Sequence, residues 1–172
     1  MPGCKGDGGQ ASGIRPWNRS GSRRVMRSAT RGQSAGMTDL IAILYRSEAL
    51  TKAGSGEDTR ILTAAQGRNG SLLVTGFLHR ENDVFYQWLE GPAAAVRTVF
   101  ASIAADRRHR DVRKLSEFAI DERSFPRWSM AYSDGSATSL FDWAAKAGIS
   151  LHMVQPDRIL AFLQYCSQRS LF

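Results

Sequence analysis

The stretch LLVTGFLHRENDVFYQWL (residues 72–89) contains two β-prone runs, 72–79 and 84–89, separated by the polar segment REND. Such runs, rich in β-branched and aromatic residues and joined by turn-forming residues, are typical of a β-hairpin. Gly91 and Pro92 follow and end the second strand, and proline is favoured in the first turn of a helix. The stretch therefore predicts a hairpin that leads directly into a helix.

Strands and helices continue on both sides of this hairpin. The apolar run LIAILY (40–45) has no polar alternation, as expected of a central strand that is covered on at least one face. Ser55 and Asp58 resemble a capping box, and apolar residues then recur at helical spacing until Gly67, which predicts a first helix. After Pro92, a second helix has an apolar face of Val96, Val99, Phe100 and Ile103.

Two further β-prone segments, 112–120 and 129–132, complete the order βαββαββ. Each helix has a single apolar stripe to bury, so we expect an α+β fold with a ferredoxin-like sheet and both helices on one face. Residues 139–147 and 156–171 predict two C-terminal helices, and the second has a stripe of Ile159, Leu160, Leu163 and Cys166. These two helices are too short for a domain of their own, and we expect them to pack on the opposite face of the sheet.

The 172 residues carry a formal net charge of +7, which is concentrated at the N-terminus. Residues 1–36 hold seven basic residues against Asp7 alone, together with eight of the sixteen glycines. A segment with so little apolar material cannot offset the entropy lost on ordering, so we predict a disordered basic tail. It could be an arm that contacts nucleic acid, a transit-like leader, or sequence upstream of a start at Met37. We expect residues 37–134 to form the folded domain and 135–172 a helical extension.

The cysteines and apolar runs argue against several classes of protein. Cys4 and Cys166 form no CxxC pair, so we expect neither a metal site nor a disulfide framework, and a reducing cytoplasm fits. No apolar run approaches the roughly 20 residues that cross a bilayer, so we expect no membrane association. An acylphosphatase-type enzyme or a nucleic-acid-binding module is the alternative for this fold. However, no phosphate-cradling loop is found, and Tyr86 and Trp88 are the nearest approach to an RNA-binding aromatic pair.

Five short segments carry the strongest functional signal: LYRS (44–47), NGSLLVTG (69–76), FYQWLEGP (85–92), DRRHRDV (106–112) and RSFPRWSMAY (123–132). Taken together and in this order, they resemble the BLUF family of flavin photoreceptors. Any one of them alone would be a weak signal, because short motifs often match by chance. The resemblance covers the chain from Asp39 to Asp134.

This resemblance implies that an oxidised flavin, FAD or else FMN or riboflavin, lies between the first two helices. Tyr45 then matches the electron and proton donor to the excited flavin. Gln87 matches the residue that links this tyrosine to the flavin and is rearranged by light. On composition alone, Tyr45 is more readily a core aromatic and Gln87 a glutamine bonded to neighbouring backbone.

Four more residues would line the flavin by the same resemblance. Asn69, which we place after the first helix where it could also act as a C-terminal cap, would bond the polar edge of the ring. Arg68 would lie beside it. Ile61 and Ile103 would form the apolar walls that a flat ring requires.

Two clusters later in the chain complete the expected site. Asp106, Arg108 and His109, otherwise a solvated charge run, match residues that contact the flavin edge and its ribityl and phosphate side. Trp128 and Met130 are two positions apart in a predicted strand, so they face the same side and could simply be core residues. In the resembling receptors this pair lies beside the switching glutamine. We therefore expect a sensor without catalytic activity, which signals to a downstream protein or to a second copy of the chain.

Overall fold

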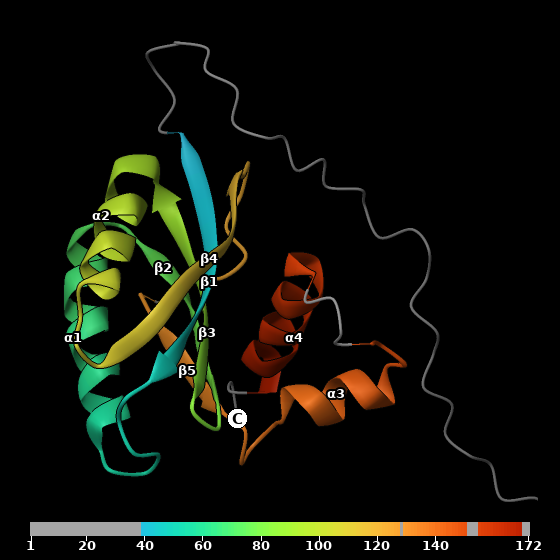
Figure 1. Cartoon of the computed structure of the whole chain (residues 1–172). Helices are drawn as coiled ribbons and strands as arrows, with labels where there is room; N and C mark the ends of the chain where they lie inside the picture. The colour runs from blue at the N-terminus through green and yellow to red at the C-terminus, as the bar shows by residue number, and fades with distance from the viewer. Residues whose placement is uncertain (1–38, 128, 151–154, 170–172) are drawn as a thin grey trace, which may run out of the picture.

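The computed structural model describes residues 39–127, 129–150 and 155–169 (Figure 1). The predicted basic tail lies outside these residues. None of the described helices combines the length and the apolar character that crossing a membrane requires. Along the chain the elements are β1 (Leu40–Ala49), α1 (Glu57–Ser71), β2 (Thr75–Glu81), β3 (Val84–Pro92), α2 (Ala93–Ala104), β4 (His109–Ala119), β5 (Ala131–Asp134), α3 (Leu140–Lys146) and α4 (Pro156–Arg169).

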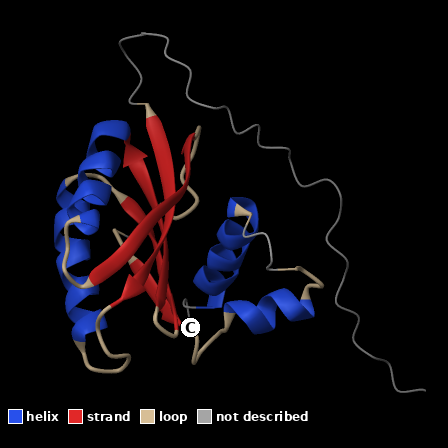
Figure 2. Ribbon diagram, in the orientation of Figure 1, coloured by secondary structure: helices blue, strands red, loops and turns tan. Residues whose placement is uncertain are grey.

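The strands form a 5-stranded sheet in the order β4-β1-β3-β2-β5. β1 lies in the interior and pairs antiparallel with both β3 and β4, β2 pairs antiparallel with β3, and β5 runs parallel to β2. Figure 2 shows α1 and α2 on one face of this sheet and α3 and α4 on the other side. The predicted α+β, ferredoxin-like fold with two C-terminal helices is thereby confirmed.

Each face of the sheet has its own apolar core. On the α1–α2 face, β1 contributes Ile43 and Tyr45. On the other face, Ala42 and Leu44 of the same strand pack in one cluster with Phe162 of α4. Because side chains alternate along a strand and both faces are buried, the run LIAILY has no polar position. The C-terminal helices therefore pack where the sequence predicts, opposite α1 and α2.

Helix α1 differs from the prediction at both ends. Its N-cap is Gly56 in the left-handed conformation, and no side chain caps it, so the predicted capping box of Ser55 and Asp58 is wrong. Asp58 instead accepts a hydrogen bond from Arg80 Nη1 at 2.6 Å, in a partly buried ion pair. The helix also ends later than predicted, so Asn69 lies in its last turn and is not a cap that follows it.

The strand ends also shift. The hairpin turn consists only of Asn82 and Asp83, because β2 continues to Glu81. Asn82 has a positive φ of 52°, a conformation that asparagine tolerates better than most residues. β4 begins earlier than predicted, at His109, and β5 begins later, at Ala131.

Gly76 tests how closely β2 and β3 approach each other. A Cβ at this position would lie 2.0 Å from the carbonyl oxygen of Trp88, which is backbone and cannot move aside. We expect Gly76→Ala to lower the free energy of unfolding by about 3 kcal/mol or more, as measured by denaturant titration. Gly67, in the exposed middle of α1, is the matched control because its Cβ would meet nothing within 4 Å. Gly67→Ala should raise stability by about 0.5–1 kcal/mol, and equal effects of the two variants would contradict this prediction.

Candidate functional site

A chain of three side chains lies on the α1–α2 face of the sheet. Tyr45 on β1 is the register partner of Gln87 on β3, so the two side chains point to the same face side by side. The Tyr45 hydroxyl donates a hydrogen bond to Gln87 Oε1. Gln87 Nε2 in turn donates to Met130 Sδ at 3.0 Å. The structure thus joins three of the residues singled out by the sequence into one buried hydrogen-bonded chain.

The Tyr45 phenol is held in its protonated form. Tyr45 is fully buried, with its ring 5.5 Å from that of Phe100. This burial raises the pKa of the Tyr45 phenol well above its usual range, whereas the positive charge of Arg68 lowers that pKa and the negative charge of Asp106 raises it. At neutral pH Tyr45 is therefore a protonated hydrogen-bond donor, and Gln87 accepts its bond.

Gln87 keeps unused hydrogen-bonding capacity inside an apolar surrounding. Its amide offers two N–H groups and two lone pairs on the oxygen, and Tyr45 and Met130 use one of each. The acceptor of its N–H is a thioether, which is a weak acceptor. Since a weak bond is readily exchanged for a stronger one, the orientation of this amide is only weakly fixed at its nitrogen end.

Helices α1 and α2 contribute both apolar and polar groups to the site. Ile61 and Ile103 are buried in the same core cluster as Tyr45. Asn69 Nδ2 donates to the carbonyl oxygen of Ser129 at 3.1 Å, while its Oδ1 is buried without a hydrogen-bond partner among the described residues. An unsatisfied buried acceptor is unusual in a folded protein, and it marks a place where a ligand donor would be bound.

One hydrogen bond joins the two helices directly. Arg68 Nη1, in the last turn of α1, donates to Ser102 Oγ of α2 at 2.7 Å. Arg68 is exposed at this position, so its bond to Ser102 lies at the surface end of the space between the helices. This hydrogen bond therefore ties the last turn of α1, which also carries Asn69, to α2.

The charged residues after α2 form a compact group at the start of β4. Arg108 Nη2 lies 2.6 Å from Asp106 Oδ2, and this hydrogen bond lowers the pKa of the Asp106 carboxyl to about 2. His109 Nδ1 shares a hydrogen bond of 2.9 Å with Ser47 Oγ of β1, and its ring lies 5.1 Å from that of Phe85. Burial lowers the pKa of His109, so this imidazole is neutral near pH 7. The three residues are therefore partly buried and held by specific partners.

Two hydrogen bonds to the backbone of Ser129 and Met130 were not predicted from the sequence. Gln66 Nε2, on α1, donates to the carbonyl oxygen of Met130 at 3.0 Å. Ser129 precedes it and accepts the hydrogen bond from Asn69. No sequence pattern signals either contact, because both go to backbone. Trp128, the other residue predicted beside Gln87, lies outside the described residues.

A buried carboxylate fixes the segment that leads to Met130. Glu90, fully buried on β3, accepts hydrogen bonds from the backbone nitrogens of Ser124 at 2.8 Å and Phe125 at 2.6 Å, and from Trp88 Nε1 at 2.8 Å. Beside it, Arg123 donates to the carbonyl oxygen of Glu90 at 3.0 Å. An acidic residue in an otherwise apolar strand is a sequence signal for such an anchor, since a buried charge must be paired or hydrogen-bonded.

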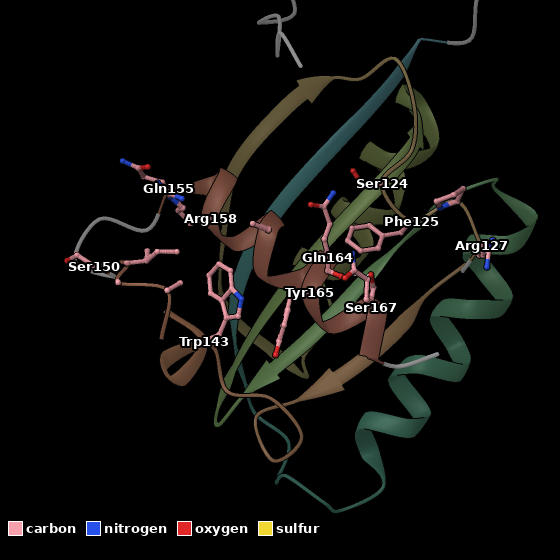
Figure 3. A pocket seen from close by; sticks show the side chains of 16 residues that line it. Ser124, Phe125, Arg127, Trp143, Ser150, Gln155, Arg158, Gln164, Tyr165 and Ser167 are labelled. Carbon is pink, nitrogen blue, oxygen red and sulfur yellow. Dashed lines mark hydrogen bonds between the residues drawn. The ribbon is translucent and has the colours of Figure 1, made fainter. Parts of the chain in front are cut away.

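A cavity of about 1190 Å³ lies on the opposite side of the molecule, between the C-terminal helices and the segment that contains Phe125. Figure 3 shows Trp143 and Tyr165 at its wall, with Phe125 beside α4. None of the residues of the Tyr45–Gln87–Met130 chain lines it. The molecule therefore has a buried hydrogen-bonded chain on one face of the sheet and an open cavity on the other.

A ferredoxin-like sheet with a buried tyrosine–glutamine pair under two helices defines a class of flavin-based light sensors. The comparison with protein families gives the same answer, because the model for "Sensors of blue-light using FAD" matches residues 40–131. The chain belongs to this family, the BLUF family, whose members use FAD as cofactor.

Known relatives and structures agree with this assignment. The chain is 28% identical over 138 residues to the photoactivated adenylate cyclase subunit beta of Euglena longa, and 30% identical to the subunit alpha of Euglena gracilis. These matches cover 76% of this chain but only 16% and 14% of the two relatives. Among solved structures, the dark-state BLUF protein BlrB superimposes with a TM-score of 0.65 at 28% identity, covering 78% of this chain and 99% of that one. The ground state of BlsA gives a TM-score of 0.62 at 29% identity, covering 72% and 85%.

The residues of the site fit a flavin. The ring of a flavin carries hydrogen-bond donors and acceptors on one edge and is otherwise flat and apolar. Asn69 offers an unpaired buried acceptor, Gln87 offers a spare donor and acceptor, and Ile61 and Ile103 offer apolar surface. These four residues would hold the ring, with Asp106, Arg108 and His109 towards its side chain.

Asn69 provides a direct test of this fit. We expect Asn69→Ala to raise the dissociation constant for FAD about tenfold, because one or two buried hydrogen bonds are lost. Fluorescence titration of the apoprotein with FAD measures the effect. Thr63→Ala, on the exposed outer side of the same helix, is the control and should leave the affinity unchanged. An Asn69→Ala variant that binds FAD as tightly as the wild type would remove Asn69 from the site.

Proposed function

We propose that this chain is a blue-light receptor in which Tyr45 and Gln87 form the photoactive pair. The observation that carries the proposal is the buried chain from Tyr45 through Gln87 to Met130. It lies within the residues that match the family model. A bound oxidised flavin absorbs blue light and becomes a strong acceptor of an electron and a proton.

Tyr45 supplies the proton and the electron. Its phenol is oxidisable, and its raised pKa keeps the proton on the oxygen until the side chain is oxidised. Among the described residues, Gln87 Oε1 is the side-chain atom that accepts this proton in a hydrogen bond. The proton therefore leaves Tyr45 along this bond and returns along it.

Gln87 is left rearranged after the proton has returned to Tyr45. Turning its amide over, or converting it to the tautomer, exchanges donor for acceptor at both ends. If the amide turns over, its carbonyl oxygen replaces Nε2 beside Met130 Sδ, and the bond to sulfur is lost because a carbonyl oxygen cannot donate. One hydrogen bond contributes about 0.5–1.5 kcal/mol, which changes an equilibrium by up to about tenfold. That is enough to shift the equilibrium between two conformations of a contact surface.

The altered contact at Met130 is passed to the remainder of the chain. Met130 directly precedes β5, so residues 37–134 would act as the sensor and 135–172 as the output extension. The output is a downstream protein or a second copy of the chain, and the chain has no catalytic activity of its own. Cys166 is buried in the core on the C-terminal side of the sheet, and a reducing cytoplasm suits this protein.

Light-induced absorption tests the proposal. Purified protein supplied with FAD, FMN and riboflavin should take up a flavin and turn yellow. Blue light should then shift its absorption reversibly to longer wavelength. Gln87→Leu should still bind flavin but lose the shift, since leucine cannot form either hydrogen bond. Protein that is folded but takes up none of the three flavins would refute the function.

Tyr45 gives a second, independent test. Tyr45→Phe should keep flavin binding but abolish the reversible red shift, because phenylalanine has no proton to give along the bond to Gln87. Tyr86→Phe is the matched control, since Tyr86 is the neighbour of Gln87 on β3 but packs on the opposite face. A full red shift in Tyr45→Phe would contradict the assigned role, as would its loss in Tyr86→Phe alone.

A further inference from the structure

Strand β5 is tied to β2 through a side-chain contact on the face away from Gln87. His79 of β2 is the register partner of Ser133 of β5, and Ser133 Oγ lies 2.8 Å from His79 Nδ1. His79 is completely buried, with the edge of its ring against Phe162 of α4 at a centroid distance of 4.7 Å. The imidazole therefore lies between the sheet and the C-terminal helices.

The same imidazole contacts a carboxylate that holds the first turn of α3. His79 Nε2 lies 3.0 Å from Glu81 Oε2. Glu81 accepts two further hydrogen bonds, from Ser139 Oγ at 2.9 Å and from the backbone nitrogen of Leu140 at 2.7 Å. Ser139 is the N-cap of α3, so Glu81 fixes the start of this helix on β2.

The chemistry of these groups sets the direction of each hydrogen bond. Burial lowers the pKa of His79, although Glu81 and Asp134 act in the opposite direction, so the ring is neutral near pH 7. A carboxylate accepts only, and the proton of the neutral ring therefore lies on Nε2. His79 Nδ1 must then accept from the Ser133 hydroxyl, which leaves one continuous chain from β5 to α3.

The packing around Glu81 leaves little room for movement. The Cα of Gly135, which follows β5, approaches so closely that a Cβ there would lie 3.3 Å from Glu81 Oε1. The backbone nitrogen of Gly135 also donates to the carbonyl oxygen of Arg80 at 2.8 Å. A shift of the end of β5 would therefore displace the Glu81 carboxylate, either directly or through His79.

We propose that Ser133, His79 and Glu81 form a relay that transmits the position of β5 to the first turn of α3. The proposal rests on the proposed function in one respect, because it takes light-induced rearrangement at Met130 as the event that moves β5. Met130 and Ser133 are three residues apart on opposite faces of one extended segment. The relay carries the change through the sheet to the side that the flavin does not contact.

The far end of the relay lies next to a surface that a partner could contact. Helix α3 presents Phe141, which is 55% exposed, and contributes Trp143 to the large cavity on this side of the molecule (Figure 3). The ring of Trp143 also packs against Phe162 at 5.5 Å. Loosening the first turn of α3 would thus change both the exposed aromatic residue and the wall of the cavity.

Hydrogen–deuterium exchange of the full chain in the dark tests the coupling without reference to light. Glu81→Gln should raise the exchange rates of the amides of residues 140–142 about threefold to tenfold, because the bonds of one carboxylate are weakened. Ser133→Ala, on a different strand, should raise them by a similar factor. The double variant should exchange no faster than Glu81→Gln alone, since both changes break the same chain. Ser167→Ala on α4, whose hydroxyl donates to the carbonyl oxygen of Gln164 in the same helix, is the control and should have no effect.

Hydrogen–deuterium exchange of the flavin-loaded protein, measured in the dark and under blue light, completes the experiment. In the wild type, blue light should alter exchange at residues 140–142. In Ser133→Ala and Glu81→Gln, the red shift should persist while the change at α3 falls to less than about a third, because one of the serial bonds is missing.

The outcomes separate the two proposals. The relay is overturned if Ser133→Ala leaves α3 exchange at the wild-type rate, if the two single effects simply multiply, or if the variants keep the full light-induced change. It is also overturned if wild-type protein shows the red shift without any change at α3. A wild type that takes up no flavin refutes the proposed function instead. The relay is then tested by the exchange rates of the single and double variants of Ser133 and Glu81 in the dark.

Discussion

The antiparallel register of β1 and β3 is the constraint on which the remaining chemistry depends. It places Tyr45 directly opposite Gln87, on the face that α1 and α2 cover. A slip of one residue would turn Tyr45 towards α4 and separate it from Gln87, because side chains alternate between the two faces. Both faces of β1 are buried, so such a slip would also expose or misplace a full row of apolar side chains. The core that stabilises the fold thereby fixes the geometry of the site.

The strand that follows the site is held very differently. β5 has four residues and is paired along one edge only. Side chains fix it at a few points: Gln66 on the carbonyl oxygen of Met130, and Tyr132, whose hydroxyl donates to Asp58 Oδ2 at 3.1 Å. Upstream, Glu90 anchors the backbone at Ser124 and Phe125. An element with few ladder bonds at the edge of a sheet belongs to the less stable parts of a fold, whereas β1 belongs to the most stable.

The sequence predicts the element order and the two-faced core, because these follow from periodicity. The membership of Tyr45 and Gln87 in one site follows only from the resemblance to the BLUF family that the short motifs carry. Prediction from the sequence fails where a partner that is distant in the sequence determines the contact. Asp58 looks like part of a helix cap but is taken by Arg80, which is distant in sequence. Asn69 looks like a residue after the helix but is buried in the last turn of α1. The pairing of His79 with Ser133 depends on the parallel register of β2 and β5, which no local pattern specifies.

The free energies of single hydrogen bonds explain why a photoreceptor of this design needs both a fully buried central strand, β1, and a loosely held edge strand, β5. Reorienting Gln87 changes one or two hydrogen bonds, each contributing about 0.5–1.5 kcal/mol, and a two-state equilibrium can shift only by this difference. Such a change could not displace β1, whose side chains are buried on both faces. In the proposed mechanism it would displace a short edge strand, because the residue that precedes β5, Met130, contacts Gln87 through a weak bond to sulfur. The thioether acceptor would be part of the switch in the proposed mechanism, since a stronger acceptor at this position would hold the amide and leave too little free energy to move the strand.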